Sequence, residues 1–430
     1  MRIAALASAI GGVTAAQSLI EAERLAEVRQ AFASPEPATP LRCSFEPERP
    51  KLHYDLQFHT GYSIVIPLSR TAGSEHELTV LLRVTPDGRD PVYLSRTDAL
   101  PNLPPMKFEG ELAGEFVLGE GAYAVDAIVR NGSGPLCSGK WRLQVKRPGG
   151  ERELPPATPP SYVRENSDRG PAAPMRGGPA IERLTILLHA AAAHPRAAKL
   201  EESTVRMLED SLASLNRRLS AQSVRLVVFN ADQHNVLLRK NGFTAADLPQ
   251  VSSVLERVEL ARVDYRTLQN RDKGDLLSDL VEKELRDPRP ASAVIFLGPR
   301  APSILDPAFQ PDPQIVARLR WFYLEYENLV RAADQPFGRR GYGRGTAGPD
   351  DPRMGGGGGR GRRGIGADPT APSDPPNYIE RADGIEQLLR RIRGETIPVR
   401  TPREFAEAIV RMRSQIPAAN RAPEPAASSR

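Results

Sequence analysis

The chain has 430 residues, enough for two or three domains, since one domain usually takes about 100 to 200 residues. Its 58 basic and 53 acidic residues give a net charge of +5, a mixed surface that excludes the concentrated basic field of a dedicated nucleic-acid binder. The 41 prolines and 35 glycines indicate long linkers between folded parts.

The first residues have the pattern of a short signal peptide, over residues 1–16. Arg2 is followed by an uncharged apolar run at 3–13 and then by small residues suited to cleavage. A run of about 11 residues is too short for a bilayer core, which needs about 20 helical residues. We therefore expect a secreted or periplasmic protein with no membrane span, followed at 17–40 by a helical, proline-rich lead-in. The alternative is an ordinary N-terminal helix continuing into 18–32.

The two cysteines, Cys43 and Cys137, bracket a segment with strand character, and we assign residues 41–147 to one β-domain. In an oxidising compartment this placement predicts one disulfide between an early and a late strand. Closing such a loop contributes around 4 kcal/mol in the chain-entropy model. Two buried free thiols are the alternative if the chain is not exported.

Within this domain, residues 52–58 alternate apolar and polar side chains, as a strand with one buried face does. Glycine-containing turn signals at 86–88, 119–121 and 131–134 separate further candidates. These further strands are expected at 62–68, 78–84, 92–94, 115–118, 122–129 and 141–145. About seven short strands at this spacing predict an all-β immunoglobulin-like sandwich, a module suited to contact with a partner.

His53, Asp55 and His59 offer imidazole and carboxylate groups of the kind that bind zinc. On a straight strand, however, the two histidines lie roughly 20 Å apart at about 3.3 Å per residue, too far for one ion to touch both. We therefore expect a solvated polar face here, and a metal site only if the strand bends.

Residues 148–179 are rich in proline and glycine and predict a disordered linker. Residues 180–415 then alternate between strand-like and helix-like segments, which predicts a doubly wound α/β domain with a largely parallel sheet. The expected strands are 184–188, 224–229, 236–239, 293–297, 321–326 and 396–399. The expected helices are 197–219, 243–258, 273–285, 386–392 and 403–412, the last opened by Pro402.

Several segments resemble the bacterial VWFA-related proteins, which combine a von Willebrand factor A type domain with an N-terminal sandwich. The resemblance rests on the strands 184–188, 224–229 and 292–297, on the ending 388–405, on Gly-Glu-Gly-Ala-Tyr-Ala-Val-Asp at 119–126 and on Cys137. It covers about three quarters of the chain. It implies the fold class of an α/β doubly wound, von Willebrand A-like domain behind an immunoglobulin-like sandwich.

Metal-binding relatives of this kind carry Asp-x-Ser-x-Ser after the first strand. Here the corresponding positions hold His189, Ala191 and Ala193, and Gly298 follows the strand that ends at 297. Alanine has no oxygen ligand for a hard cation, so we expect no metal at this edge of the sheet. Candidate replacements for the missing oxygen ligands are Asp264, Thr267, Asp272 and Asp275. Such residues more often cap helices, and we favour that role here.

His189 and His194 flank the same loop and could hold a transition metal together, but without a third ligand we favour two surface histidines. The sequence contains no Gly-x-Ser-x-Gly elbow and no phosphate-binding loop of the Gly-x-x-x-x-Gly-Lys type. We therefore expect a protein that is not an enzyme and has no cofactor.

A glycine- and arginine-rich stretch interrupts the second domain at 335–377, where we expect a disordered insertion. Its basic residues are candidates for contact with a polyanion: Arg339, Arg340, Arg344, Arg360, Arg362 and Arg363. In an exported protein a flexible surface loop is the stronger interpretation, and an anionic glycan a better partner than nucleic acid. The tail at 416–430 is also expected to be disordered.

Together these observations predict a secreted or periplasmic, non-catalytic and metal-independent interaction module whose partner is a protein or another component of the cell envelope. Polyanion binding through the glycine-rich loop is one alternative. The other is a divalent-cation-dependent adhesin with non-standard ligands.

Overall fold

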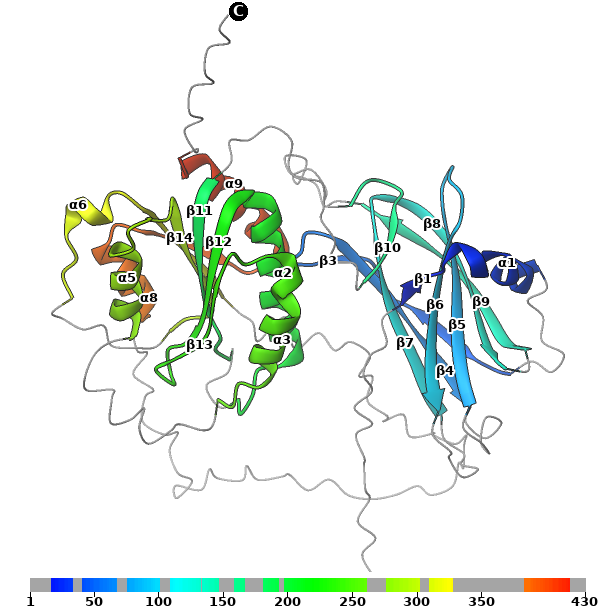
Figure 1. Ribbon diagram of the computed structural model, residues 1–430. Coiled ribbons are helices and arrows are strands. Elements are labelled where there is room, and N and C mark those ends of the chain that lie inside the picture. The colour runs from blue at the N-terminus through cyan, green and yellow to red at the C-terminus, as the bar shows by residue number, and fades with distance from the viewer. Residues whose placement is uncertain are drawn as a thin grey trace, which may run out of the picture.

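The computed structural model describes residues 17–33, 41–67, 76–100, 109–132, 134–146, 158–166, 181–192, 197–260, 276–301, 309–327 and 383–417. They form two units that lie side by side in Figure 1. The N-terminal unit (17–166) is built from two β-sheets, and the C-terminal unit (181–417) from one sheet with helices. The predicted signal peptide and insertion lie outside the described residues, and so does the predicted tail apart from residues 416 and 417. Within the linker predicted to be disordered, residues 158–166 are described and include strand β10 (Val163–Glu165), so the prediction is wrong for that part.

Two antiparallel sheets form the N-terminal unit. The first has the order β1 (Ser18–Leu19), β6 (Val92–Leu100), β5 (His76–Pro86), β8 (Gly121–Asn131) and β9 (Gly134–Val145). The second has the order β10 (Val163–Glu165), β7 (Glu109–Leu118), β4 (Phe58–Pro67) and β2 (Ser44–Pro47), with β3 (Lys51–Leu52) also paired to β4. Inward-facing apolar side chains of both sheets make one core, which includes Ile64, Val80 and Phe116.

The disulfide between Cys43 and Cys137 is confirmed, with Cα atoms 6.3 Å apart. Cys137 lies on β9 of the first sheet, and Cys43 immediately precedes β2 of the second, so the bridge ties the two sheets together. Outside this core, the short 3-10 helix η1 (Ala22–Arg24) and helix α1 (Leu25–Ala33) cover the outer face of the first sheet. There Val28 and Phe32 pack on Leu81 and Ile128.

The turn between β7 and β8 explains the Gly-x-Gly-x-Tyr pattern as local architecture. A Cβ atom on Gly119 would lie 1.9 Å from the backbone oxygen of Pro159, so only glycine allows the two chains to approach this closely. Gly121 adopts φ +149°, and the hydroxyl of Tyr123 donates a hydrogen bond of 2.7 Å to the Gly119 carbonyl. These residues therefore fix the segment 158–166 against the sandwich.

The third sheet has the order β13 (Asn235–Asn241), β12 (Ala221–Asn230), β11 (Ile181–His189), β14 (Ala293–Gly298), β15 (Arg320–Tyr326) and β16 (Glu395–Val399). Its strands are parallel except for β13, which turns back antiparallel to β12. The central strands are continuous runs of Val, Ile, Leu and Phe, because both faces of this sheet are buried.

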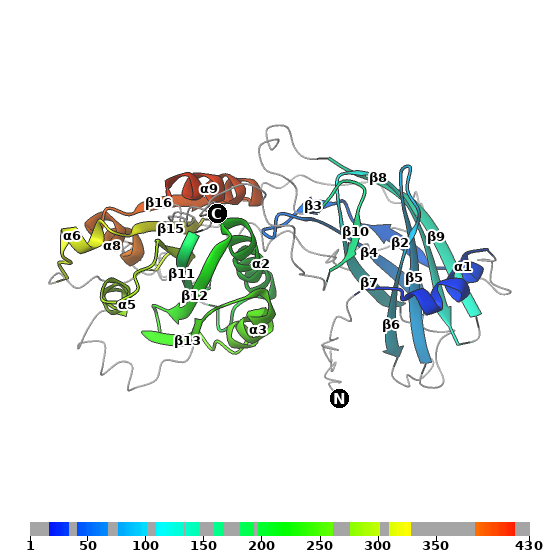
Figure 2. The same ribbon diagram turned by 45° about the horizontal axis from the view of Figure 1, so that its top comes forward.

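Helices pack on both faces of this sheet (Figure 2). One face carries α2 (Glu202–Leu219), α3 (Leu248–Glu256) and α9 (Pro402–Gln415), and the other carries α5 (Leu276–Leu285), α6 (Pro313–Val316) and α8 (Gly384–Arg391). A 3-10 turn, η3 (Ala245–Asp247), precedes α3. Helix α9 starts as expected, with Pro402 in its first turn and the Thr401 hydroxyl accepting from the Glu404 amide. Helix α2 lies on the side that faces the sandwich (Figures 1 and 2).

The predicted fold class, a doubly wound α/β domain behind an immunoglobulin-like sandwich, is wrong for this chain. The described residues are 44% strand and 29% helix and form three sheets, two of them entirely antiparallel. The prediction gave too much weight to the alternation over 180–415. In that region the strand expected at 236–239 is present as β13, but it runs antiparallel to β12. Helices α3, α5, α6 and α8 have at most 10 residues each.

A second correction concerns the strand predicted over 52–58. Strand β3 ends at Leu52 and β4 begins at Phe58, and the five residues between them make a turn. The turn is closed by the His53 amide on the Gln57 carbonyl at 3.0 Å and by the Leu56 amide on the His53 carbonyl at 2.9 Å. Leu56 has φ +61°, a conformation that alternation of apolar and polar residues does not reveal.

Candidate functional site at the interface of the two units

The turn at 53–57 leaves the sandwich and inserts into the core of the C-terminal unit. The side chain of Leu56 is buried in the apolar cluster that also contains Phe405 and Tyr326. The ring of Tyr54 packs edge-on against both of these aromatic rings, at centroid distances of 5.8 and 5.4 Å. The left-handed conformation of Leu56 costs on the order of 1 to 3 kcal/mol, and the burial of both side chains offsets it.

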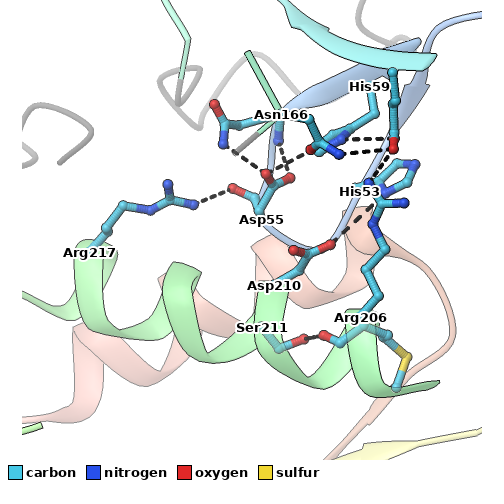
Figure 3. Close-up of polar contacts among 11 residues, drawn as sticks. His53, Asp55, His59, Asn166, Arg206, Asp210, Ser211 and Arg217 are labelled. Atoms are coloured by element: carbon cyan, nitrogen blue, oxygen red, sulfur yellow. Dashed lines mark hydrogen bonds and ion pairs between the residues drawn. The ribbon is translucent and has the colours of Figure 1, made fainter. Parts of the chain in front are cut away.

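A charged cluster surrounds this apolar contact, and Figure 3 shows most of its members. We define the cluster as six side chains from both units: His53, Asp55, His59, Glu115, Arg206 and Asp210. The first four belong to the sandwich, and the last two project from α2. At its centre, His59 is 4% exposed, with Nε2 2.9 Å from Asp55 Oδ2 and Nδ1 3.1 Å from Glu115 Oε1. An imidazole flanked by a carboxylate on each nitrogen donates to both and is therefore protonated.

Helix α2 supplies the other half of the contact. Arg206 donates to Oε2 of Glu115, the oxygen not used by His59. Arg217, about three turns further along the helix, donates to the backbone carbonyl of Asp55 at 2.9 Å. His53 stacks on His59 with ring centroids 4.2 Å apart, and its Nδ1 lies 4.0 Å from Asp210 Oδ2. Helix α2 thus contacts the sandwich through two arginines, one at the Glu115 carboxylate and one at the backbone of the turn.

Further hydrogen bonds hold the turn in its shape. Both carboxylate oxygens of Asp55 accept from Gln57, one from the amide nitrogen of the backbone at 3.0 Å and one from the side chain at 2.7 Å. Thr158 donates to the Gln57 side chain at 2.8 Å, and Asn166 donates to Glu115 at 3.0 Å. The segment 158–166 therefore braces the cluster from the side of the sandwich.

The two histidines have very different pKa values, because their charged neighbours differ. Burial disfavours charge on His59, but the Asp55 carboxylate and then Glu115 outweigh it and raise the pKa of His59 to about 10. Burial and, after it, the charge on His59 lower the pKa of His53 to about 3. Burial alone would raise the pKa of Glu115. The hydrogen bond from His59 and the charge of Arg206 outweigh this effect and lower the pKa to about 2. At neutral pH one ring is cationic and the ring stacked on it is neutral.

The prediction that His53, Asp55 and His59 line a solvated face is wrong. The estimate of their separation assumed a straight strand, whereas the turn folds His53 back over His59. Asp55 and His59 are both buried. Sequence reasoning missed Glu115 and Arg206, which lie 56 residues from His59 and 91 residues from Glu115 respectively. The only local signal was the group of polar residues at 53–59.

The edge of the third sheet, where the resemblance places a metal motif, has a different structure. His189 ends β11 and is buried rather than on the surface, and its ring stacks on Phe229 at a centroid distance of 5.1 Å. Its Nδ1 donates to the Pro299 carbonyl at 3.0 Å, and burial lowers its pKa, so the ring is neutral. Among the described residues, its Nε2 has no hydrogen-bond partner.

The neighbouring positions are apolar or lack side chains. Ala191 is buried. Gly298 has φ +147°, and a Cβ atom there would lie 2.6 Å from the His189 carbonyl oxygen, so this glycine serves the close approach of β14 to β11. Asp383, buried at the start of α8, accepts from the amides of Ile385 and Ala301 and thereby caps the helix. The described residues at this edge serve packing and capping.

Other residues singled out from the sequence lie outside the described residues. They are Ala193 and His194, the four candidate oxygen ligands Asp264, Thr267, Asp272 and Asp275, and the arginines of the glycine-rich loop, Arg339, Arg340, Arg344, Arg360, Arg362 and Arg363. Within the described part of the chain, no helix has both the length and the apolar character needed to cross a membrane.

Comparison with known proteins assigns no family. No family model matches the chain, and no curated protein matches it. Solved structures with some likeness include a GH3 beta-glucosidase from Bifidobacterium adolescentis, with 10% identity, 26% of this chain and 19% of that chain covered, and a TM-score of 0.16. A glycosyl hydrolase family 2 member from Bacteroides cellulosilyticus has 10% identity, coverage of 66% and 41%, and a TM-score of 0.19.

A third structure, beta-glucuronidase 2 from Bacteroides uniformis, has 11% identity, coverage of 66% of this chain and 36% of that chain, and a TM-score of 0.18. The chain thus spans less than half the length of each of these structures. TM-scores this far below 0.5 carry no argument about fold or activity.

Proposed function

We propose that this protein is a secreted or periplasmic, non-catalytic interaction protein whose two units act as one recognition body. The observation that carries the proposal is the insertion of Tyr54 and Leu56 of one unit into the core of the other, surrounded by the charged cluster. A flexible pair of domains would have no reason to bury a strained turn in this way. The partner is a protein or another component of the cell envelope.

The location rests on two features. The disulfide between Cys43 and Cys137 suits an oxidising compartment, and the first residues have the pattern of a signal peptide. A fusion of residues 1–40 to an export-dependent reporter enzyme tests this part directly. Reporter activity outside the cytoplasm supports export, and its loss on changing the apolar run to charged residues identifies that run as the signal. An inactive reporter contradicts the proposed location.

The interaction role is supported by how the polar groups at the interface are used. His59, the group best placed there for acid–base chemistry, has both ring nitrogens bonded to internal carboxylates. Such pairing holds Glu115 in the position where Arg206 of α2 contacts it, and it engages both nitrogens that could exchange protons with a substrate. The resemblance to VWFA-related proteins stays a prediction, and the proposal does not depend on it.

Binding by the full chain tests the proposal. Immobilised wild-type protein is incubated with the native envelope fraction, and any protein it retains is purified and titrated against wild type and a Tyr54→Ala, Leu56→Ala double variant. We expect the double variant to bind at least about tenfold more weakly, since its two units no longer hold one orientation. Tyr162→Ala, at a 46% exposed position of the sandwich, is the matched control. Equal affinity of the double variant contradicts recognition by one rigid body.

A further inference from the structure

We infer that the charged cluster is a binding site for a zinc-like divalent transition metal, held by His59, Glu115 and His53. Nδ1 or Nε2 of each histidine and a carboxylate oxygen of Glu115 all lie within 4.8 Å of one another. Two imidazoles and one carboxylate are a common set of zinc ligands. This inference goes beyond the proposed function, because it concerns what fixes the interface and not what the protein recognises.

The spacing of the central pair fits a shared ion. His59 Nδ1 and Glu115 Oε1 are 3.1 Å apart. Two ligands of a tetrahedral zinc ion, each about 2.1 Å from the metal, lie about 3.4 Å from each other. Inserting an ion between these two atoms therefore needs a movement of only a few tenths of an ångström. Glu115 Oε2 stays bound to Arg206, which leaves Oε1 as the oxygen for the metal.

The second ring nitrogen of His59, Nε2, has a hydrogen-bond partner typical of a metal-binding histidine. Metal-ligating histidines usually donate their second N–H to a carboxylate, which orients the ring and makes it a better ligand. Asp55 fills this role, with Oδ2 2.9 Å from His59 Nε2, and its own position is held by two hydrogen bonds from Gln57. The outer partner of His59 is therefore in place before any ion enters.

His53 would complete the set of protein ligands. It lies in the turn, with 17% of its side chain exposed, and its contact with Asp210 is loose at 4.0 Å. One of its ring nitrogens already lies within 4.8 Å of the ligand atoms of His59 and Glu115, and water would occupy the fourth position.

Binding of the metal ion displaces one proton from His59. Without metal, the N–H at His59 Nδ1 bridges to Glu115. When the divalent cation binds, this proton leaves to solvent and the Nδ1 lone pair and the Glu115 oxygen become ligands. The cluster gains one positive charge in the exchange, next to the carboxylates of Asp55 and Asp210. Both units contribute to the surroundings of the ion, so its binding should tighten the contact between the sandwich and α2.

The experiment is a calorimetric titration of the untagged full chain, freed of metal by a chelator that is then removed, with zinc sulfate at neutral pH. Repeating it in two buffers of different ionisation enthalpy counts the protons released. We expect one zinc per chain, release of about one proton, and a rise in melting temperature with zinc. Magnesium and calcium should give neither heat nor stabilisation, because the site offers imidazoles rather than a set of oxygens.

His53→Gln is the decisive variant, because it removes one ligand and leaves the bridge of His59 between Asp55 and Glu115 intact. Its zinc affinity should fall at least about tenfold, and its melting temperature should no longer rise with zinc, whatever the loss of the stack on His59 costs in chelator. His234→Gln, in the turn between β12 and β13, is the matched control and should bind like wild type. Zinc binding that is unaffected by His53→Gln, or no binding by wild type, overturns the inference. Partner binding measured in chelator tests the proposed function separately.

Discussion

The ring of Tyr54 meets the ring of Tyr326 edge-on, with centroids 5.4 Å apart and planes at 84°. The hydroxyl of Tyr326 is in turn 2.5 Å from that of Ser211 on α2. This pair couples the turn of the sandwich to strand β15 and helix α2 of the other unit. The Tyr54 side chain is therefore one of the links between the stability of the two units.

We expect Tyr54→Ala to lower the free energy of unfolding by about 2 kcal/mol, less than the 3 to 5 kcal/mol of a fully buried aromatic ring because Tyr54 is only partly buried. Urea denaturation followed by fluorescence measures the change, and the transition should broaden or split as the units unfold separately. Tyr162→Ala should shift stability by less than about 0.5 kcal/mol. A single unshifted transition for Tyr54→Ala would show that the interface adds nothing.

The charged cluster should make stability depend on pH at both ends of the scale. The pKa of His59 is raised from 6.5 to about 10. Its contribution is therefore complete below pH 6.5 and is lost as the pH rises towards 10. The pKa of Glu115 is lowered from 4.5 to about 2, so its contribution is present above pH 4.5 and is lost as the pH falls towards 2.

Thermal melting of wild type and His59→Gln in chelator, from pH 5 to 10, measures the alkaline limb. Wild type should be more stable by on the order of a few kcal/mol near pH 6, and the difference should shrink steadily above pH 6.5. His234→Gln should follow the wild-type curve. A wild-type advantage that stays constant to pH 10 would show that His59 is not charged in the folded protein.

The bridge between Cys43 and Cys137 closes a loop with a sequence separation of 94 residues. The chain-entropy model gives a contribution of about 4 kcal/mol for a loop of this length. The Cys43→Ser, Cys137→Ser double variant should lose up to this amount, measured by urea denaturation under oxidising conditions. Wild type treated with reductant should match the double variant, and equal stability of oxidised and reduced wild type would contradict the prediction.

Gly119 should tolerate no side chain. In Gly119→Ala the new Cβ would meet the Pro159 oxygen at 1.9 Å, so the segment 158–166 must shift, at a cost of about 1 to 3 kcal/mol. Gly132→Ala is the matched control, because a Cβ atom there has no neighbour within 4 Å. Melting temperatures of the two variants give the comparison. Equal melting temperatures would mean that the turn is free to move.

Local sequence patterns determined much of the secondary structure. The buried run at 293–297 is strand β14, Thr401 and Pro402 start α9, and the two cysteines pair as expected. These features depend on periodicity, capping and spacing along the chain, which act over short distances or through a single covalent bond. Short elements without such signals were missed, among them β10 and α6.

Only the tertiary structure decided the proportion of strand to helix and the contact between the two units. Alternation at 52–58 predicts a strand, yet the chain turns there because burial of Leu56 and Tyr54 in another unit offsets the cost of a left-handed residue. His59 acquires its charge from Asp55 and Glu115, the latter 56 residues away, and Glu115 is held by Arg206, a further 91 residues along. Burial and charge act through space, and a single sequence does not state which distant residues will meet.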